Sequence, residues 1–94
     1  MIVRLMGEGQ WRVDDRVRAR IEELDAETER AVAAGDEQSV QAALQAIHEL
    51  VRTSGEQLHH AHLGASDVVV PPADLSLGEA RELLNGDGLI PELP

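Results

Sequence analysis

The sequence of 94 residues has no cysteine, no lysine and only one aromatic residue, a tryptophan. Without cysteine, no disulfide can stabilise the fold and no thiolate can bind zinc, which suits a reducing compartment. No apolar stretch approaches the roughly 20 residues that a membrane-spanning helix needs. Residues 1–6 are too short for the apolar core of a signal peptide. We therefore expect a cytosolic protein.

Basic residues are also scarce, and all eight are arginines against eighteen acidic residues. Residues 1–20 hold five of the arginines and three acids, so most of the net charge of −10 comes from residues 21–94. Such a surface repels phosphate, which disfavours direct binding to nucleic acid or anionic lipid. A single tryptophan offers no stacking platform for single-stranded nucleic acid. A basic or mixed protein surface is the favoured partner.

The N-terminal residues predict a β-hairpin. Residues 2–6 are rich in β-branched and apolar side chains, and residues 10–13 alternate polar with apolar, as a half-buried strand does. Between them, Gly7 and Gly9 flank Glu8 in a predicted tight turn.

Two consecutive helices are predicted next. Asp14 or Asp15 caps a helix that runs to about Ala34, and Gly35 ends it. Asp36 caps a second helix over residues 37–53. Their apolar stripes are Val17, Ile21, Leu24 and Val32 in the first, and Val40, Leu44, Ile47 and Val51 in the second. Joined by so short a connection, the helices form an antiparallel αα-hairpin.

The C-terminal third adds a strand and a short helix. Residues 54–66 predict a polar loop, and the run at 68–70 predicts a strand that is covered on both faces or extends the hairpin sheet. Ser76 and Glu79 form a capping box, so a short helix begins there. Its inward residues are Ala80, Leu83 and Leu84. The chain is thus expected to be one α+β domain, residues 1–94, with element order ββααβα.

A cluster of histidines invites a metal-binding interpretation. His59, His60 and His62 lie in the predicted polar loop, with Glu56 upstream and His48 on the second helix. Imidazole groups bind zinc, copper and nickel, so a metal sensor or metal-dependent enzyme is one alternative function. The spacing is not the i, i+4 pair of a zinc enzyme, and we favour a solvated loop without metal.

No other pattern predicts catalysis. A phosphate-binding loop leads into a helix, whereas the turn at residues 7–9 leads into a strand and carries an acid. The serines are few, and helix caps or turns account for two of them. The carboxylates of residues 22–37 are typical of a solvated helix face. We expect a protein that is not an enzyme.

The arginines near the N-terminus predict either local ion pairs or a docking surface. Local pairs with Glu22, Glu23 and Glu27 are common on helices and weak, and we favour them. The alternative is a basic edge that meets an acidic helix of a partner. Trp11 either fills the core, which we favour, or anchors an interface. The candidate partner-interface residues are Arg4, Trp11, Arg12, Arg16 and Arg20.

Three segments, taken together and in order, resemble the PspAA family, small proteins associated with phage shock protein A. The opening strand and turn at residues 1–13, MIVRLMGEGQWRV, resemble the start of the family. The segment at 66–74, SDVVVPPAD, resembles its acidic-apolar-proline motif. Residues 77–91 resemble its C-terminal helix and tail. The first two motifs are the more specific ones.

The resemblance implies an accessory protein of an envelope-stress system in bacteria or archaea. The partner that it implies is a coiled-coil protein like phage shock protein A, which is peripheral to the membrane. It implies neither enzymatic activity nor a cofactor. We therefore expect a non-catalytic adaptor. A self-assembling scaffold, in which hairpin edges of different copies pair, is a further alternative.

Overall fold

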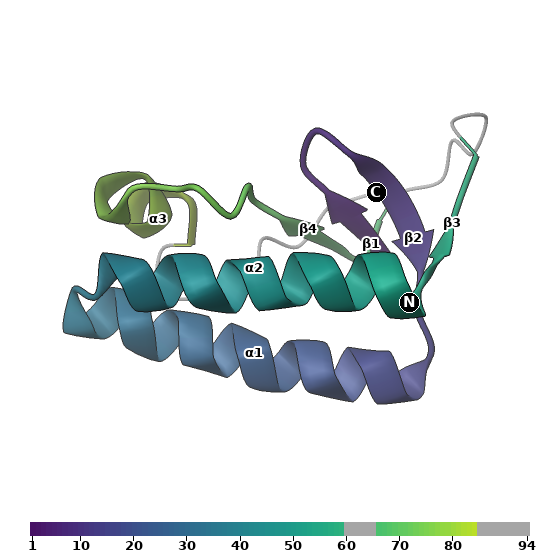
Figure 1. Ribbon diagram of the computed structural model, residues 1–94, viewed down its shortest axis with the longest axis horizontal. Coiled ribbons are helices and arrows are strands. Elements are labelled where there is room, and N and C mark those ends of the chain that lie inside the picture. Colours follow the sequence, from purple (N-terminus) through teal and green to yellow (C-terminus); the bar gives the residue numbers. More distant parts are fainter. Residues whose placement is uncertain (60–65, 85–94) are drawn as a thin grey trace.

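The expected α+β fold is confirmed by a computed structural model, which describes residues 1–59 and 66–84 (Figure 1). The described residues form three helices and a four-stranded mixed sheet. The elements are β1 (Ile2–Leu5), β2 (Gly9–Arg12), α1 (Asp15–Ala34), α2 (Glu37–Ser54), β3 (Glu56–Gln57), β4 (Val68–Val70) and α3 (Leu77–Leu84). The predicted order ββααβα holds, with the short β3 added between α2 and β4.

The sheet has the strand order β3-β2-β1-β4. The predicted hairpin is formed by antiparallel β1 and β2, with Val3 opposite Trp11. β4 runs parallel to β1, so the predicted extension of the hairpin sheet is confirmed. β3 was not predicted, because its two residues are polar and exposed and therefore show no alternation.

The helix ends lie where the capping residues predict them. Asp14 caps α1 by accepting a hydrogen bond from the backbone N–H of Val17 at 3.0 Å, and Asp36 does the same for α2. Gly35 ends α1 in the left-handed conformation, at φ 71°. The capping box of α3 closes in both directions between Ser76 and Glu79, each bond being 3.2 Å.

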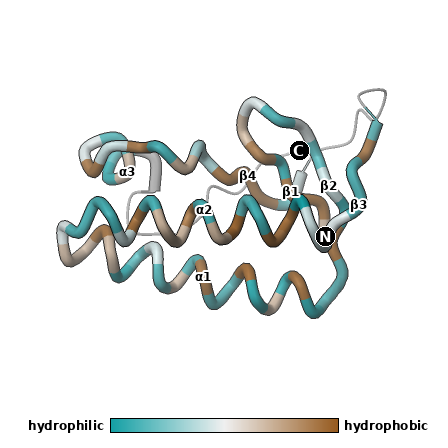
Figure 2. The backbone as a smooth tube through the Cα atoms, in the orientation of Figure 1, coloured by the Kyte–Doolittle hydropathy of each residue, from teal (hydrophilic) through white to brown (hydrophobic). Residues whose placement is uncertain are grey.

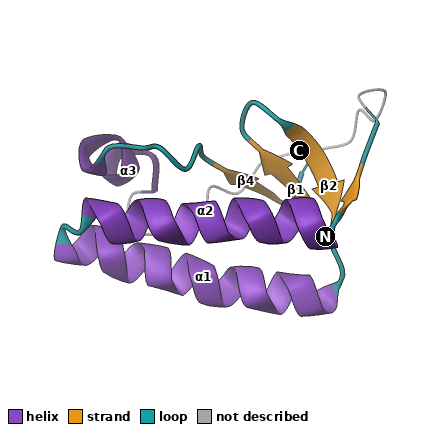
Figure 3. Ribbon diagram, in the orientation of Figure 1, coloured by secondary structure: helices purple, strands orange, loops and turns teal. Residues whose placement is uncertain are grey.

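The core lies where the two helices meet each other and the sheet. α1 and α2 run antiparallel, the sheet packs at one end of this pair, and α3 lies at the other end (Figures 1 and 3). Apolar residues gather along the facing sides of the helices and on β1 and β4 (Figure 2). Trp11 is 5% exposed and belongs to this core, as does Ala80 of α3. The side chains of Leu83 and Leu84, also predicted to point inward, lie outside the described residues.

Within the described ranges 1–59 and 66–84, no helix is both long and apolar enough to cross a membrane.

Candidate functional site

The turn between β1 and β2 directs an acidic side chain toward α2. Gly7 and Gly9 have φ values of 84° and 123°, which side-chain-bearing residues rarely adopt. The tight reversal that they allow places Glu8 at the tip of the hairpin. Its carboxylate lies beside α2 and is one-third exposed.

Two side chains of α2 bind this carboxylate. Arg52 donates a hydrogen bond from Nη1 to Glu8 Oε1 at 2.7 Å. His48 Nδ1 lies 3.1 Å from Glu8 Oε2, and its Nε2 donates to the carbonyl oxygen of Pro71 at 2.7 Å. His48 is only 3% exposed. We name Glu8, His48, Arg52 and the Pro71 carbonyl the tip cluster. It joins the hairpin turn, α2 and the segment after β4.

The electrostatics of the tip cluster favour the ionised form of Glu8. The hydrogen bond from Arg52 is the main reason that the pKa of Glu8 lies below its usual value, and the hydrogen bond with His48 acts in the same direction. Partial burial opposes this shift without cancelling it. The carboxylate is therefore a permanent hydrogen-bond acceptor at neutral pH.

In the sequence, Glu8 spoke only against a phosphate-binding loop, and His48 was predicted only as a possible metal ligand. Glu8 and His48 are 40 residues apart, so no local spacing connects them. The available signal was the acid held between two glycines at a hairpin tip. Because such a tight turn fixes the direction of its side chain, a charged residue there can make a specific tertiary contact.

The segments that carry the family resemblance contact one another. Gln10 of β2 donates from Nε2 to the hydroxyl oxygen of Ser66 at 2.6 Å. The backbone N–H of Ile2 donates to Asp67 Oδ2 at 2.7 Å. Glu8 and Pro71 meet at His48. The two most specific sequence motifs thus form one contiguous contact, centred on the N-terminal hairpin.

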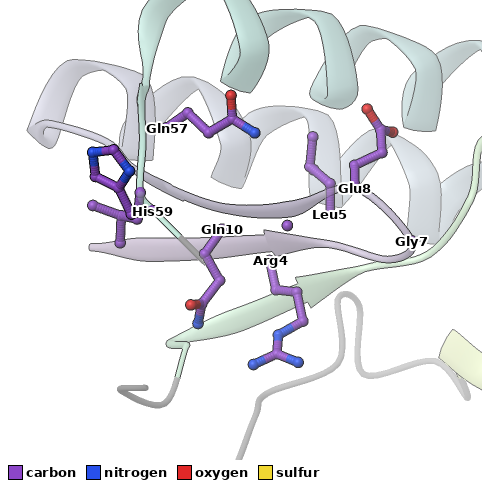
Figure 4. A pocket seen from close by; sticks show the side chains of 9 residues that line it. Arg4, Leu5, Gly7, Glu8, Gln10, Gln57 and His59 are labelled. Carbon is purple, nitrogen blue, oxygen red and sulfur yellow. The ribbon is translucent and has the colours of Figure 1, made fainter. Parts of the chain in front are cut away.

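The sheet face that points away from the helices holds two of the predicted interface residues. Arg4 and Gln10 are opposite one another in the hairpin register and both project from this face (Figure 4). Arg12 lies diagonally across from Arg4, at a separation of about 7–8 Å for such neighbours. Arg4 is half-buried and Arg12 is exposed. Arg4, Gln10 and His59 are among the residues that line a groove of about 620 Å³ here.

The other predicted arginines lie in the helical layer. Arg16 and Arg20 are both exposed and occupy one side of α1, a single turn apart. Arg20 pairs with Glu23 at 2.8 Å, and the neighbouring Arg18 pairs with Glu22 at 3.4 Å. The favoured prediction of local ion pairs is confirmed for Glu22 and Glu23. Since more than half of each of these side chains is exposed, the pairs contribute little to stability.

The five predicted interface residues therefore do not form one patch. Arg4 and Arg12 share the outer face of the sheet, and Arg16 and Arg20 share a side of α1. Trp11 points to the opposite side of the sheet from Arg12 and is buried, so it presents almost no surface to a partner. The favoured assignment of Trp11 to the core agrees with this placement.

The histidine loop is only partly described. His59 is exposed, whereas His60 and His62 lie outside the described residues. Both ring nitrogens of His48 face oxygen atoms of the tip cluster, which leaves neither for a metal. Within ranges 1–59 and 66–84, no three His, Cys, Asp or Glu side chains are grouped to hold a metal ion.

The fold and the surface define a class: an acidic α+β domain built on a β-hairpin and an αα-hairpin. The family model of the PspA-associated protein, PspAA, matches residues 1–92. The chain therefore belongs to the PspAA family, and its role is linked to phage shock protein A. Neither the curated proteins nor the solved structures that were compared gave a match.

Proposed function

We propose that this protein is a non-catalytic adaptor that docks directly on a coiled-coil protein like phage shock protein A. The observation that carries the proposal is the family match over residues 1–92. A protein that belongs to a family defined by its association with another protein has that protein as its first candidate partner.

The polar groups of the interior support a non-catalytic role. In the described part of the chain, the buried polar residues are Thr28, His48 and Ser66. The Thr28 hydroxyl donates to the carbonyl oxygen of Leu24 at 2.8 Å, and the Ser66 hydroxyl accepts from Gln10. His48 is held in the tip cluster. Each of these groups therefore serves the fold, and none of the three is poised as a nucleophile or general base.

The charge distribution along α1 supports docking on a long helix. Arg16, Arg18 and Arg20 are exposed near the start of α1, and five acids follow between residues 22 and 29. A helix of 20 residues is about 30 Å long. A partner helix that lies along α1 with the opposite charge order gains attraction at both the basic and the acidic segment, and the reversed orientation is repelled. The basic segment of α1, Arg16 to Arg20, is the proposed contact.

Size-exclusion chromatography with light scattering tests the proposal. The protein is measured alone and mixed with the phage-shock-protein-A-like protein of the same genome. A co-eluting complex of defined stoichiometry is expected. No complex at concentrations of tens of micromolar would rule out direct docking of useful affinity. A mass that rises with concentration for the protein alone would instead support self-assembly.

Charge reversal then locates the contact. The double variant Arg16→Glu/Arg20→Glu is expected to weaken the complex at least tenfold, because attraction at the basic segment becomes repulsion. Arg30→Glu is the matched control, since it reverses an exposed arginine at the far end of the same helix. Arg12→Glu tests the sheet face. If Arg12→Glu weakens binding and the double variant does not, the partner contacts the sheet and the assignment to α1 is wrong.

A further inference from the structure

The His48 ring lies between two oxygen acceptors. Ionised Glu8 and the carbonyl group of Pro71 both accept hydrogen bonds and have no proton to give. The ring nitrogens lie 3.1 Å from the carboxylate and 2.7 Å from the carbonyl oxygen. Imidazolium donates from both nitrogens, whereas neutral imidazole donates from only one. In the neutral form, the lone pair of one ring nitrogen faces an oxygen lone pair. This arrangement is unfavourable because His48 is only 3% exposed and water cannot replace the lost hydrogen bond.

Among the described residues, the charged groups that line the groove beside this ring come from three parts of the chain. Glu8 belongs to the hairpin turn, Arg52 to α2, and Asp74 to the segment after β4, and all three line the same groove of about 570 Å³ as His48. Arg52 binds the oxygen of Glu8 that His48 does not bind. Because Arg52 keeps the carboxylate ionised, Glu8 stays an acceptor throughout the range in which imidazole groups titrate.

We propose that the tip cluster is a proton-dependent latch. When His48 is protonated, it fastens the hairpin tip to α2 and to Pro71; when it loses that proton, the tip loosens. The latch goes beyond the adaptor function and does not depend on it. Its release frees one wall of the groove, where Met6 is a large apolar residue that is already 38% exposed. How firmly the hairpin tip is held against α2 thus depends on pH.

Amide hydrogen exchange of the full chain measures the latch. The N–H of Glu8 bonds the carbonyl oxygen of Leu5 at 2.9 Å, and the N–H of Met6 bonds that of Val70 at 3.0 Å. Corrected for intrinsic exchange rates, their protection is expected to fall about tenfold between about pH 5.5 and about pH 8.5. The N–H of Val13, at the other end of the hairpin, is the internal control and keeps its protection. Equal protection of Glu8 and Met6 at both pH values would overturn the proposal.

The variant Glu8→Gln separates the latch from a general effect of pH. Its amide can donate to a neutral imidazole or accept from an imidazolium, so both forms of His48 are satisfied. The pH dependence of the Met6 and residue 8 amides is therefore expected to disappear. Glu49→Gln is the matched control, because it neutralises the exposed carboxylate next to His48 in the sequence and should behave as the native protein does. Retention of the full pH dependence in Glu8→Gln would contradict the proposal.

Nitrogen NMR of the native protein gives a readout that does not depend on any variant folding. At the lower pH, both ring nitrogens of His48 are expected to carry protons, and deprotonation should coincide with the loss of amide protection at the hairpin tip. A neutral ring throughout the range would overturn the latch. A titration of His48 that leaves the Glu8 and Met6 amides unchanged would do so as well.

Discussion

α1 ends at Gly35 and α2 ends at Gly55, and the two glycines meet different constraints. Gly35 has a φ of +71°, in the left-handed region that other residues rarely occupy. A Cβ added there would fit without a clash, because it would lie at ordinary contact distances, 3.5 Å from Arg81 Nη2 and 3.9 Å from Leu77 Cδ2. Its requirement for glycine is a matter of backbone conformation alone.

Gly55 shows the opposite combination. Its φ of −93° is one that any residue adopts. A Cβ added there would lie only 2.6 Å from the carbonyl oxygen of Val51 and 3.2 Å from Val13 Cγ1. Glycine is required here because a side chain would collide with the last turn of α2 itself, and because the end of β2, with the carbonyl oxygen of Arg12 at 3.3 Å, closes the space on the other side.

The two ends of the αα-hairpin also differ in the sequence range of their side-chain hydrogen bonds. At the connection between the helices, Asp36 bonds Ser39, three residues away. At the sheet end, Arg52 bonds Glu8 across 44 residues. Local interactions therefore shape one end and tertiary contacts shape the other. Substitutions of Gly35 and Gly55 should therefore differ in how much they lower the free energy of unfolding. They should also differ in whether asparagine is tolerated better than alanine.

The largest expected effect is that of Gly55→Ala. The added methyl group overlaps the carbonyl oxygen of Val51, a backbone atom that cannot move away as a flexible side chain does, so the last turn of α2 must distort. We expect a loss of about 3 kcal/mol in the free energy of unfolding, measured with urea. Gly55→Asn should be at least as harmful. A cost within experimental error for both would mean that the close approach is easily relaxed.

His48→Leu comes next in size. Leucine fills much of the buried volume but leaves the carbonyl oxygen of Pro71 without its donor and Glu8 with Arg52 alone. We expect a loss of about 2 kcal/mol in the free energy of unfolding at neutral pH. His59→Leu, which alters an exposed histidine, is the control and should change stability by less than about 0.5 kcal/mol. Equal effects at the two sites would show that the tip cluster adds no stability.

Gly35→Ala is expected to cost about 1 kcal/mol, because alanine disfavours the left-handed conformation. Gly35→Asn should recover part of this loss, since asparagine tolerates that conformation better. Urea unfolding of the three proteins checks the order glycine, asparagine, alanine. If Gly35→Asn were no more stable than Gly35→Ala, the proposed difference between Gly35 and Gly55 would be wrong.

The smallest effect is the pH dependence that Glu8 contributes. Its pKa in the folded protein lies below the usual 4.5, chiefly because of Arg52. Its contribution is therefore present above pH 4.5 and is lost as the pH falls through the folded pKa. The difference in unfolding free energy between the native protein and Glu8→Gln should shrink from neutral to acidic pH. Since Glu8 is one-third exposed, solvent screening keeps this difference small.

Much of the fold was predictable because its signals are local. Asp14, Asp36 and the Ser76 capping box act within three residues, and each begins a helix where the sequence places it. The alternation on both sides of the turn at residues 7–9 predicted the hairpin. The two-residue β3 lacked any such pattern. Of the candidate site, only the local pairs of Arg18 and Arg20 followed from spacing.

By itself, the sequence determined the helices, their ends, the hairpin and the acidic surface, because these depend on neighbours within one or two turns. The tertiary structure alone decided that β4 joins β1 in parallel and that His48 meets both Glu8 and Pro71. Those contacts join residues 23 to 65 positions apart, over which local periodicity carries no information about pairing. Packing of the apolar faces brings the segments together, and only then do their polar groups find partners.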